Sequence, residues 1–172
     1  FPALLRASAP AFGAGLVARE SAKIAAFRAA GFGAPVILHQ SGSMKILSDL
    51  GLSLWDIALG MDAEPRRRLL RKTFKAIGLV HQAGLVHGRP HLRDMALHDD
   101  EIGFFDFEEE PELVMPLADA QARDIWLLML PVAALNRGGE TLRECLQAWM
   151  NGAPDAAIRS LIRLLRLWVP LI

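Results

Sequence analysis

The sequence has almost no means of cross-linking itself, because Cys145 is the only cysteine among 172 residues and no internal disulfide can form. Cys145 occupies an apolar position of a helical pattern, which predicts a buried, unreactive thiol. The charges also cancel, with 19 Lys and Arg against 19 Asp and Glu. A balanced charge gives no indication of nucleic-acid binding, which favours a basic surface.

Long apolar runs are missing as well. No stretch approaches the ~20 apolar residues that a membrane-spanning helix needs. No charged region followed by a long apolar stretch marks a signal peptide, so a reducing cytoplasmic compartment is the expected location. The chain starts at Phe1 without an initiator Met, which leaves open that an element before Phe1 is missing. With 52% apolar and 22% charged residues, the composition predicts a folded domain with a large core.

The first 51 residues predict a small unit made of strands and one helix. A short strand is expected at residues 3–6, and a helix over residues 16–30 that ends at Gly31. The segments "PVILHQ" and "MKILSDL" flank the turn at residues 41–43, which indicates a hairpin.

From residue 52 to residue 172 the pattern is mainly helical. Helices are expected at "SLWDIALGM" and over residues 65–83, 118–135, 140–150 and 154–168, with a second hairpin around residues 99–100. The fold class is therefore α+β, with a small part at residues 1–51 and a mainly helical part at residues 52–172. A cleft between two such parts is a common ligand site.

Two basic helical faces leave alternatives open. The residues between the apolar positions of helix 65–83 predict a solvated face or, less simply, a surface for an acidic partner. They are Arg66, Arg67, Arg68, Arg71, Lys72 and Lys75. The last helix carries Arg159, Arg163 and Arg166 and is expected to close the helical part. The alternative is that it lies on an anionic membrane surface, at the inner face of the membrane. Four tryptophans are expected in the core. They are Trp55, Trp126, Trp149 and Trp168.

Five segments, taken in order over roughly residues 4–130, resemble one family. The segments are "RESAKIAAF", "KILSDLG", "HQAGLVHGRPHLRDMAL", "FFDFE" and "ARDIWLLM". Together they resemble the protein-kinase-like fold, in its small bacterial branch near the lipopolysaccharide kinases and RIO-type kinases. The resemblance implies a two-lobed fold with a reduced N-terminal lobe and a helical C-terminal lobe that carries a catalytic-type loop.

The resemblance also implies a metal site and its support. Asp106 in "FFDFE" takes the place of the Mg²⁺ ligand, and the alternative is a carboxylate that caps the turn after a strand. Asp94 takes the place of the second ligand and suits Mg²⁺ as well as an amide does, although a salt bridge with Arg93 or Arg89 is an equal alternative. His87 and Asp124 take the places of residues that support the loop. We expect Asp124 to accept backbone hydrogen bonds from residues 87–89.

Nucleotide binding is the third implication. Glu20 takes the place of the helix glutamate, and Arg6 takes the place of the lysine that contacts the phosphates. Ser48, Asp49 and Leu50 correspond to the hinge between lobes, so ATP and Mg²⁺ are the expected cofactors. Glu20 and Asp106 are then expected to face one cleft, with residues 48–51 at its back.

One departure from the family concerns catalysis directly. Arg89 stands where the catalytic loop has its acid, and a guanidinium does not accept a proton. Arg89 either clamps a phosphate or locks the loop by pairing with Asp94 or Asp106. A general base contributes only ~10²–10⁴-fold, so Asp94 is a candidate substitute. A Gly-rich loop over the phosphates is also lacking in this sequence.

Three hypotheses of function follow. The first is an atypical ATP-dependent phosphotransferase that acts on a hydroxyl of a lipid-linked sugar, a small molecule or a protein. The second is a pseudokinase that serves as a scaffold or regulator, with little or no catalysis. The third is a helical module that binds a partner or a membrane surface without a nucleotide site.

Overall fold

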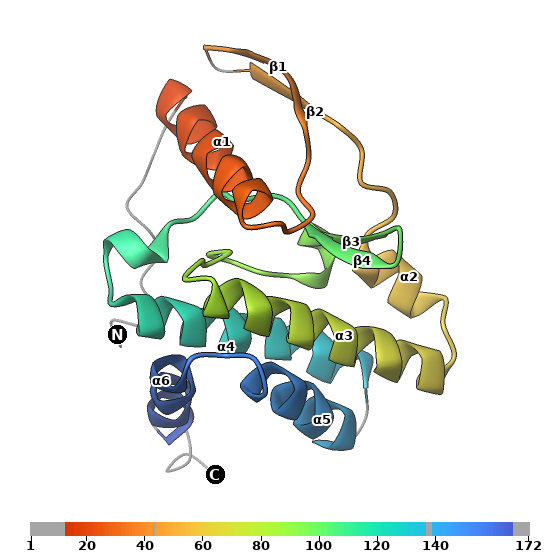
Figure 1. Ribbon diagram of the computed structural model, residues 1–172. Helices are drawn as coiled ribbons and strands as arrows, with labels where there is room; N and C mark the ends of the chain where they lie inside the picture. Colours follow the sequence, from red (N-terminus) through yellow and green to blue (C-terminus); the bar gives the residue numbers. More distant parts are fainter. Residues whose placement is uncertain (1–12, 43, 137–138, 167–172) are drawn as a thin grey trace.

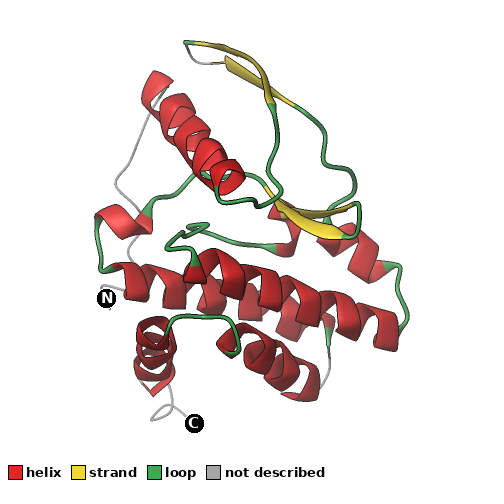
Figure 2. Cartoon of the chain, in the orientation of Figure 1, coloured by secondary structure: helices red, strands yellow, loops and turns green. Residues whose placement is uncertain are grey.

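The computed structural model describes residues 13–42, 44–136 and 139–166. Its described part contains six α-helices and two antiparallel hairpins (Figures 1 and 2). In chain order they are α1 (Ala14–Ala29), β1 (Ile37–Ser41), β2 (Met44–Leu47), α2 (Leu54–Leu59), α3 (Ala63–Gln82), β3 (Met95–His98), β4 (Glu101–Phe104), α4 (Leu117–Leu135), α5 (Gly139–Met150) and α6 (Asp155–Arg166). The predicted α+β class is confirmed.

The predicted boundaries of the elements hold to within a few residues. Both hairpins pair antiparallel, at the turns that the sequence indicates. In the second turn Asp99 and Asp100 have φ angles of 48° and 61°, as a two-residue hairpin turn requires. The strand predicted at residues 3–6 lies outside the described residues.

The two hairpins lie on different levels of the molecule (Figure 1). The helix α1 and the hairpin β1–β2 lie on one side of β3–β4, and helices α3 to α6 lie on the other side. Two isolated bridges fasten β3–β4 to its neighbours. They join Gly33 to Gly103 and Ser53 to Ala96.

The core is continuous across these levels. Phe27 of α1 meets Phe104 and Phe107 at ring-centroid distances of 5.5 and 4.6 Å, which joins α1 to the end of β4. Below, α3 packs against α5. A Cβ on Gly78 of α3 would lie 2.8 Å from the backbone oxygen of Trp149, so the two helices cross closely at a glycine.

The last helix closes the helical part, as expected, over its described residues 155–166. It packs against α4 and buries Ala157, Leu161 and Leu164 on that side, while Arg159 is exposed. Its apolar face is therefore occupied by the protein itself. No helix of the described residues combines the length and apolar character needed to cross a membrane.

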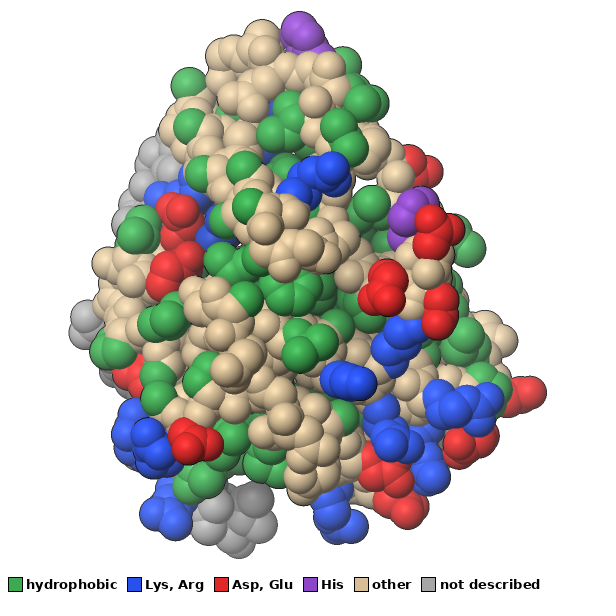
Figure 3. Space-filling model, viewed as in Figure 1, with side chains coloured by type: hydrophobic (Ala, Val, Ile, Leu, Met, Phe, Trp, Pro, Cys, Tyr) green, Lys and Arg blue, Asp and Glu red, His purple; other side chains and the backbone are tan. Residues whose placement is uncertain are grey.

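The basic face of α3 is a solvated face, as expected, with many of its charges paired internally. Arg67 lies 3.3 Å from Glu64 and 3.4 Å from Glu144, and Arg68 lies 3.2 Å from Glu64. Figure 3 shows basic and acidic side chains intermixed at the lower right of the molecule, over the start of α3. This mixture offers no uniform surface to an acidic partner.

Candidate functional site

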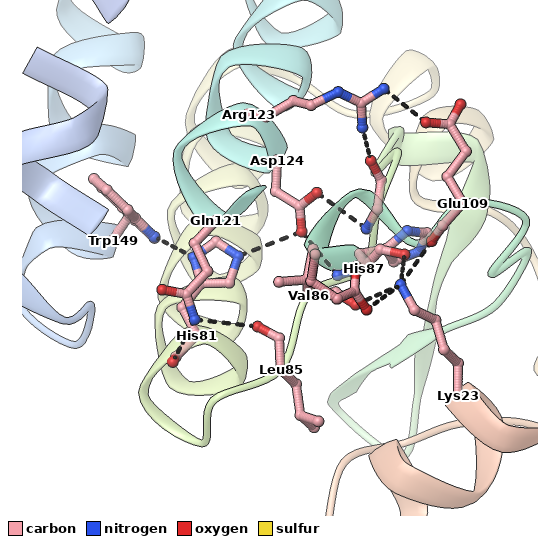
Figure 4. Close-up of polar contacts among 12 residues, drawn as sticks. Lys23, His81, Leu85, Val86, His87, Glu109, Gln121, Arg123, Asp124 and Trp149 are labelled. Atoms are coloured by element: carbon pink, nitrogen blue, oxygen red, sulfur yellow. Dashed lines mark hydrogen bonds and ion pairs between the residues drawn. The ribbon is translucent and has the colours of Figure 1, made fainter. Parts of the chain in front are cut away.

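The loop of residues 87–94 connects α3 to β3 and is held from below by α4. The carboxylate of Asp124 accepts hydrogen bonds from the backbone N–H groups of His87 and Gly88, at 2.8 and 3.0 Å (Figure 4). These are the contacts predicted from the sequence. Arg123, the preceding residue of α4, donates to the carbonyl oxygen of Gly88. Backbone N–H and C=O groups of the loop are therefore both hydrogen-bonded to α4.

A buried histidine stabilises the negative charge of Asp124. Trp149 Nε1 donates to His81 Nδ1 at 3.0 Å, and an indole nitrogen can only donate. The proton of His81 therefore lies on Nε2, which faces Asp124 Oδ2 at 3.4 Å. Burial by itself would raise the pKa of Asp124, but the hydrogen bond from His81 and the nearby charge of Lys23 help to lower it on balance. Asp124 stays ionised and supports the loop as an acceptor.

His87 plays the packing role that was expected of it. Its ring is fully buried beside Phe107, and Nε2 lies 3.1 Å from the carbonyl oxygen of Phe105 at the end of β4. Burial lowers the pKa of His87 to about 4. The imidazole is therefore neutral at physiological pH and joins the loop to the segment that carries Asp106.

A lysine that the sequence analysis did not single out ties α1 to the same loop. Lys23 Nζ donates to the carbonyl oxygens of Val86, His87 and Glu109 at 3.1, 3.1 and 2.7 Å. It also lies 3.2 Å from Glu112. These three acceptors match the three donors of an ammonium group in a side chain that is 7% exposed. The helix was predicted from the spacing of its apolar residues, and that spacing does not indicate where a lysine side chain will bind.

Asp94 and Asp106 are brought together as the resemblance implies. Asp94 closes a short 3₁₀ turn just before β3, and Asp106 follows two residues after β4. A backbone hydrogen bond of 3.0 Å from Phe105 N–H to the Asp94 carbonyl oxygen holds the two segments side by side. Asp106 has a φ of 64°, a strained conformation for a non-glycine residue and one that often accompanies function.

Burial and neighbouring carboxylates raise the pKa values of both groups. The pKa of Asp94 rises to about 7, first because of burial and then because of the charge of Asp106. The pKa of Asp106 is raised by burial first, then by Glu108, with a further contribution from Glu20. Glu20 and Asp106 thus lie close enough to interact electrically. A cation placed between Asp94 and Asp106 would remove this repulsion.

Arg89 pairs with two glutamates rather than with either aspartate. Its Nη2 donates to Glu108 at 2.6 Å, and its Nε lies 3.6 Å from Glu109. Of the two alternatives for Arg89, pairing with Asp94 or Asp106 is not what the structure shows, because Glu108 and Glu109, which follow Asp106 in the chain, pair with the guanidinium instead. Arg89 still lowers the pKa of both aspartates from its position nearby. The two candidate metal ligands are not occupied by it.

Glu20 has a partner that the sequence analysis missed. Lys45 Nζ on β2 lies 2.5 Å from Glu20 Oε2 on α1, and the lysine side chain is 6% exposed. The sequence analysis assigned the cation to Arg6, which lies outside the described residues. Lys45 lies in the strand segment "MKIL". The alternation of a strand predicts which face a side chain is on, but not that it contacts a helix elsewhere in the chain.

The residues predicted as the hinge line a cavity of their own. Ser48 accepts a hydrogen bond from Val36 N–H at 2.9 Å, and Asp49 accepts one from Gly51 N–H at 2.8 Å. With Leu50 they line a cavity of about 370 Å³ whose walls do not include Asp94 or Asp106. This cavity therefore does not join the hinge to the carboxylate pair, and the place of residues 48–51 at the back of a cleft stays a prediction.

A second cavity is lined by Asp94 of the carboxylate pair. Its volume is about 500 Å³, and its lining includes Asp94, Arg89, Arg93 and Trp55. Trp55 is partly buried there and packs against the core, whereas Trp149 is fully buried within it. Trp126 is partly buried, and Trp168 lies outside the described residues.

The other histidines give no metal site. Among the residues that the structure describes, no group of three or more His, Cys, Asp or Glu side chains is placed to hold a metal ion. The carboxylate pair by itself suits Mg²⁺, which is usually bound through one or two carboxylates together with water and substrate phosphates. Cys145 is buried, as expected, and burial raises the pKa of its thiol to about 12.

No model of a known protein family matches the chain, and no curated protein matches it significantly.

Proposed function

We propose that the protein is an atypical, kinase-like phosphotransferase that binds ATP with Mg²⁺ and transfers the γ-phosphoryl group to a hydroxyl. The observation that carries this proposal is that the segments of Asp94 and Asp106 lie side by side and the charge of Asp106 raises the pKa of Asp94, a repulsion that a divalent cation would relieve. Phosphoryl transfer needs mainly positioning and charge neutralisation, which carboxylates, a divalent cation and a lysine supply.

Each charged group has a part in this proposal. Asp106 and Asp94 would hold Mg²⁺, which neutralises phosphate charge when it is bound. Lys45, fixed by Glu20 at 2.5 Å, is the cation for the phosphates within the described part of the chain, in place of the predicted Arg6. Lys23, His87 and Asp124 fix the loop that carries Asp94, so its carboxylate is held by a rigid support.

The transfer itself balances without another reagent. The acceptor's hydroxyl oxygen forms a bond to the γ-phosphorus, and the bond between this phosphorus and the oxygen bridging to ADP breaks. The hydroxyl proton passes to the carboxylate oxygen of Asp94 that does not bind Mg²⁺, since Asp94 is the one acid within residues 87–94. ADP and the phosphorylated acceptor leave. A cytoplasmic location, where ATP is abundant, belongs to the same proposal.

Isothermal titration with Mg²⁺-ATP tests the proposal. Binding by the unmodified protein is expected to weaken at least about tenfold in Asp106→Asn, because one charge-assisted ligand is lost. Asp99→Asn, an equal charge change in the exposed turn of β3–β4, is expected to bind like the unmodified protein. Mg²⁺-ATP binding that is absent, or equal in Asp106→Asn and the unmodified protein, contradicts the proposal.

A second candidate, a pseudokinase, is favoured by one observation. Arg89 stands at the position of the catalytic acid, and its guanidinium is held by Glu108. ADP formation from ATP in the presence of a broad set of small hydroxyl acceptors separates the two candidates. The phosphotransferase is expected to show turnover that Asp94→Asn abolishes, whereas the pseudokinase binds Mg²⁺-ATP without turnover. Arg89→Asp is expected to impair the phosphotransferase and to raise the metal affinity of the pseudokinase.

A further inference from the structure

The cavity of about 500 Å³ beside Asp94 has two chemically different walls. One wall is the loop, with the cationic side chains Arg89 and Arg93, the imidazole of His91 and the carboxyl of Asp94. The opposite wall is apolar and comes from the second half of α4, where Leu130 is 53% exposed and Pro131 is adjacent. A cavity of this volume fits a small molecule.

The loop wall favours an anion. Two guanidinium groups and one imidazole face a single carboxyl in this lining. Arg89 is already paired with Glu108, but Arg93 makes no ion pair with any residue that the structure describes. A guanidinium without a carboxylate partner presents a planar set of donors that match a phosphate or a carboxylate group.

Trp55 packs against Arg93 and His91 of this wall. The guanidinium of Arg93 lies 5.2 Å from the centre of the Trp55 ring, a cation–π distance. The ring of His91 lies 5.5 Å from the same indole. His91 Nδ1 also accepts a hydrogen bond from the Arg93 backbone N–H at 3.0 Å, so its Nε2 carries the proton and remains a donor.

We infer that this cavity binds the hydroxyl acceptor, and that the acceptor carries an anionic group next to an apolar portion. The anionic group would bind Arg93 and His91, and the apolar portion would lie against Leu130 and Pro131. Its hydroxyl would then lie on the side of Asp94. That the bound molecule is the acceptor of the phosphoryl group rests on the proposed function. That the cavity binds an anion with an apolar portion rests on the cavity alone.

Calorimetric titration with phenyl phosphate tests the inference, since this probe combines an anion and an apolar ring. Inorganic phosphate carries only the anionic group, and benzyl alcohol carries the apolar ring without a charge. Phenyl phosphate is expected to bind at least about tenfold more tightly than either half, because it reaches both walls. Equal affinities for phenyl phosphate and inorganic phosphate, or no phenyl phosphate binding in the millimolar range, overturn the inference.

Three variants assign the binding to this cavity. Arg93→Gln is expected to weaken phenyl phosphate about tenfold, by the loss of charge-assisted hydrogen bonds. Leu130→Ser is expected to weaken phenyl phosphate and to leave inorganic phosphate unchanged. Arg159→Gln is the matched control, an equal charge change on the exposed side of α6, and is expected to have no effect. Equal weakening in Arg93→Gln and Arg159→Gln, or none in Arg93→Gln, overturns the inference.

Mg²⁺-ATP titration of the same samples separates this inference from the proposed function. Arg93→Gln is expected to bind Mg²⁺-ATP as the unmodified protein does, because Arg93 lies outside the carboxylate pair. Failure of Mg²⁺-ATP binding in the unmodified protein would contradict the proposed function and the acceptor role. Normal Mg²⁺-ATP binding with phenyl phosphate affinity unchanged by Arg93→Gln would contradict only the inference.

Discussion

Replacing Asp94 by asparagine is expected to stabilise the protein while weakening the proposed Mg²⁺ site. Asp94 is partly buried next to Asp106, and burial followed by the charge of Asp106 raises its pKa from 3.8 to about 7. An acid whose pKa is raised by folding destabilises the folded state wherever the unfolded chain is already ionised. Asparagine keeps the shape of the side chain and removes this cost.

The size of the effect follows from the pKa change. A shift from 3.8 to about 7 corresponds to about 4 kcal/mol for a fully buried group. Asp94 is only partly buried, so screening by water reduces this to about 2 kcal/mol. In a chain of this length, that gain corresponds to a rise in Tm of about 4–8 °C.

The sign depends on pH in a defined way. The destabilisation by Asp94 is absent below pH 3.8, grows between pH 3.8 and about 7, and is complete above that range. The advantage of Asp94→Asn in the free energy of unfolding is therefore expected to be full at pH 8 and small near pH 4. Measurements with a chelator present keep metal ions from masking the repulsion.

Urea denaturation of Asp94→Asn and the unmodified protein at both pH values is the assay. Asp99→Asn is the control, because it removes a carboxylate that is 93% exposed in the turn of β3–β4. Adding Mg²⁺ is expected to raise the Tm of the unmodified protein more than that of Asp94→Asn. An Asp94→Asn variant that is equally stable or less stable at pH 8, in the absence of metal, would refute the like-charge pair.

Three other substitutions test the support of the loop. Asp124→Ala is expected to lower the free energy of unfolding by about 1.5–3 kcal/mol through the loss of charge-assisted hydrogen bonds, and a loss below about half a kcal/mol in urea denaturation would show an ordinary surface residue. Lys23→Met is expected to cost about 2–4 kcal/mol in the same assay, because buried carbonyl oxygens lose their donor, and Lys72→Met at the protein surface is the control. Gly88→Ala is expected to cost at least about 2 kcal/mol, because φ is 110° and a Cβ would collide with the Glu109 backbone; retention of full stability would contradict that geometry.

The local sequence determined most of the secondary structure. Apolar residues at helical spacing predicted α3 and α4, and turn residues between alternating segments predicted both hairpins. These features depend on residues near one another in the chain, so they can be read without the fold. The contacts of Asp124 with residues 87 and 88 were also predicted, because the resemblance supplied the order of loop and helix.

Only the tertiary structure decided which charged groups meet. Lys45 pairs with Glu20 across 25 positions, Lys23 reaches Glu109 across 86, and Arg89 binds Glu108 rather than either aspartate. Long, flexible side chains have many partners within reach, and periodicity carries no information about which of them folding brings nearest. The cavity between the loop and α4 has the same origin, because its two walls come from segments more than thirty residues apart that only packing places face to face.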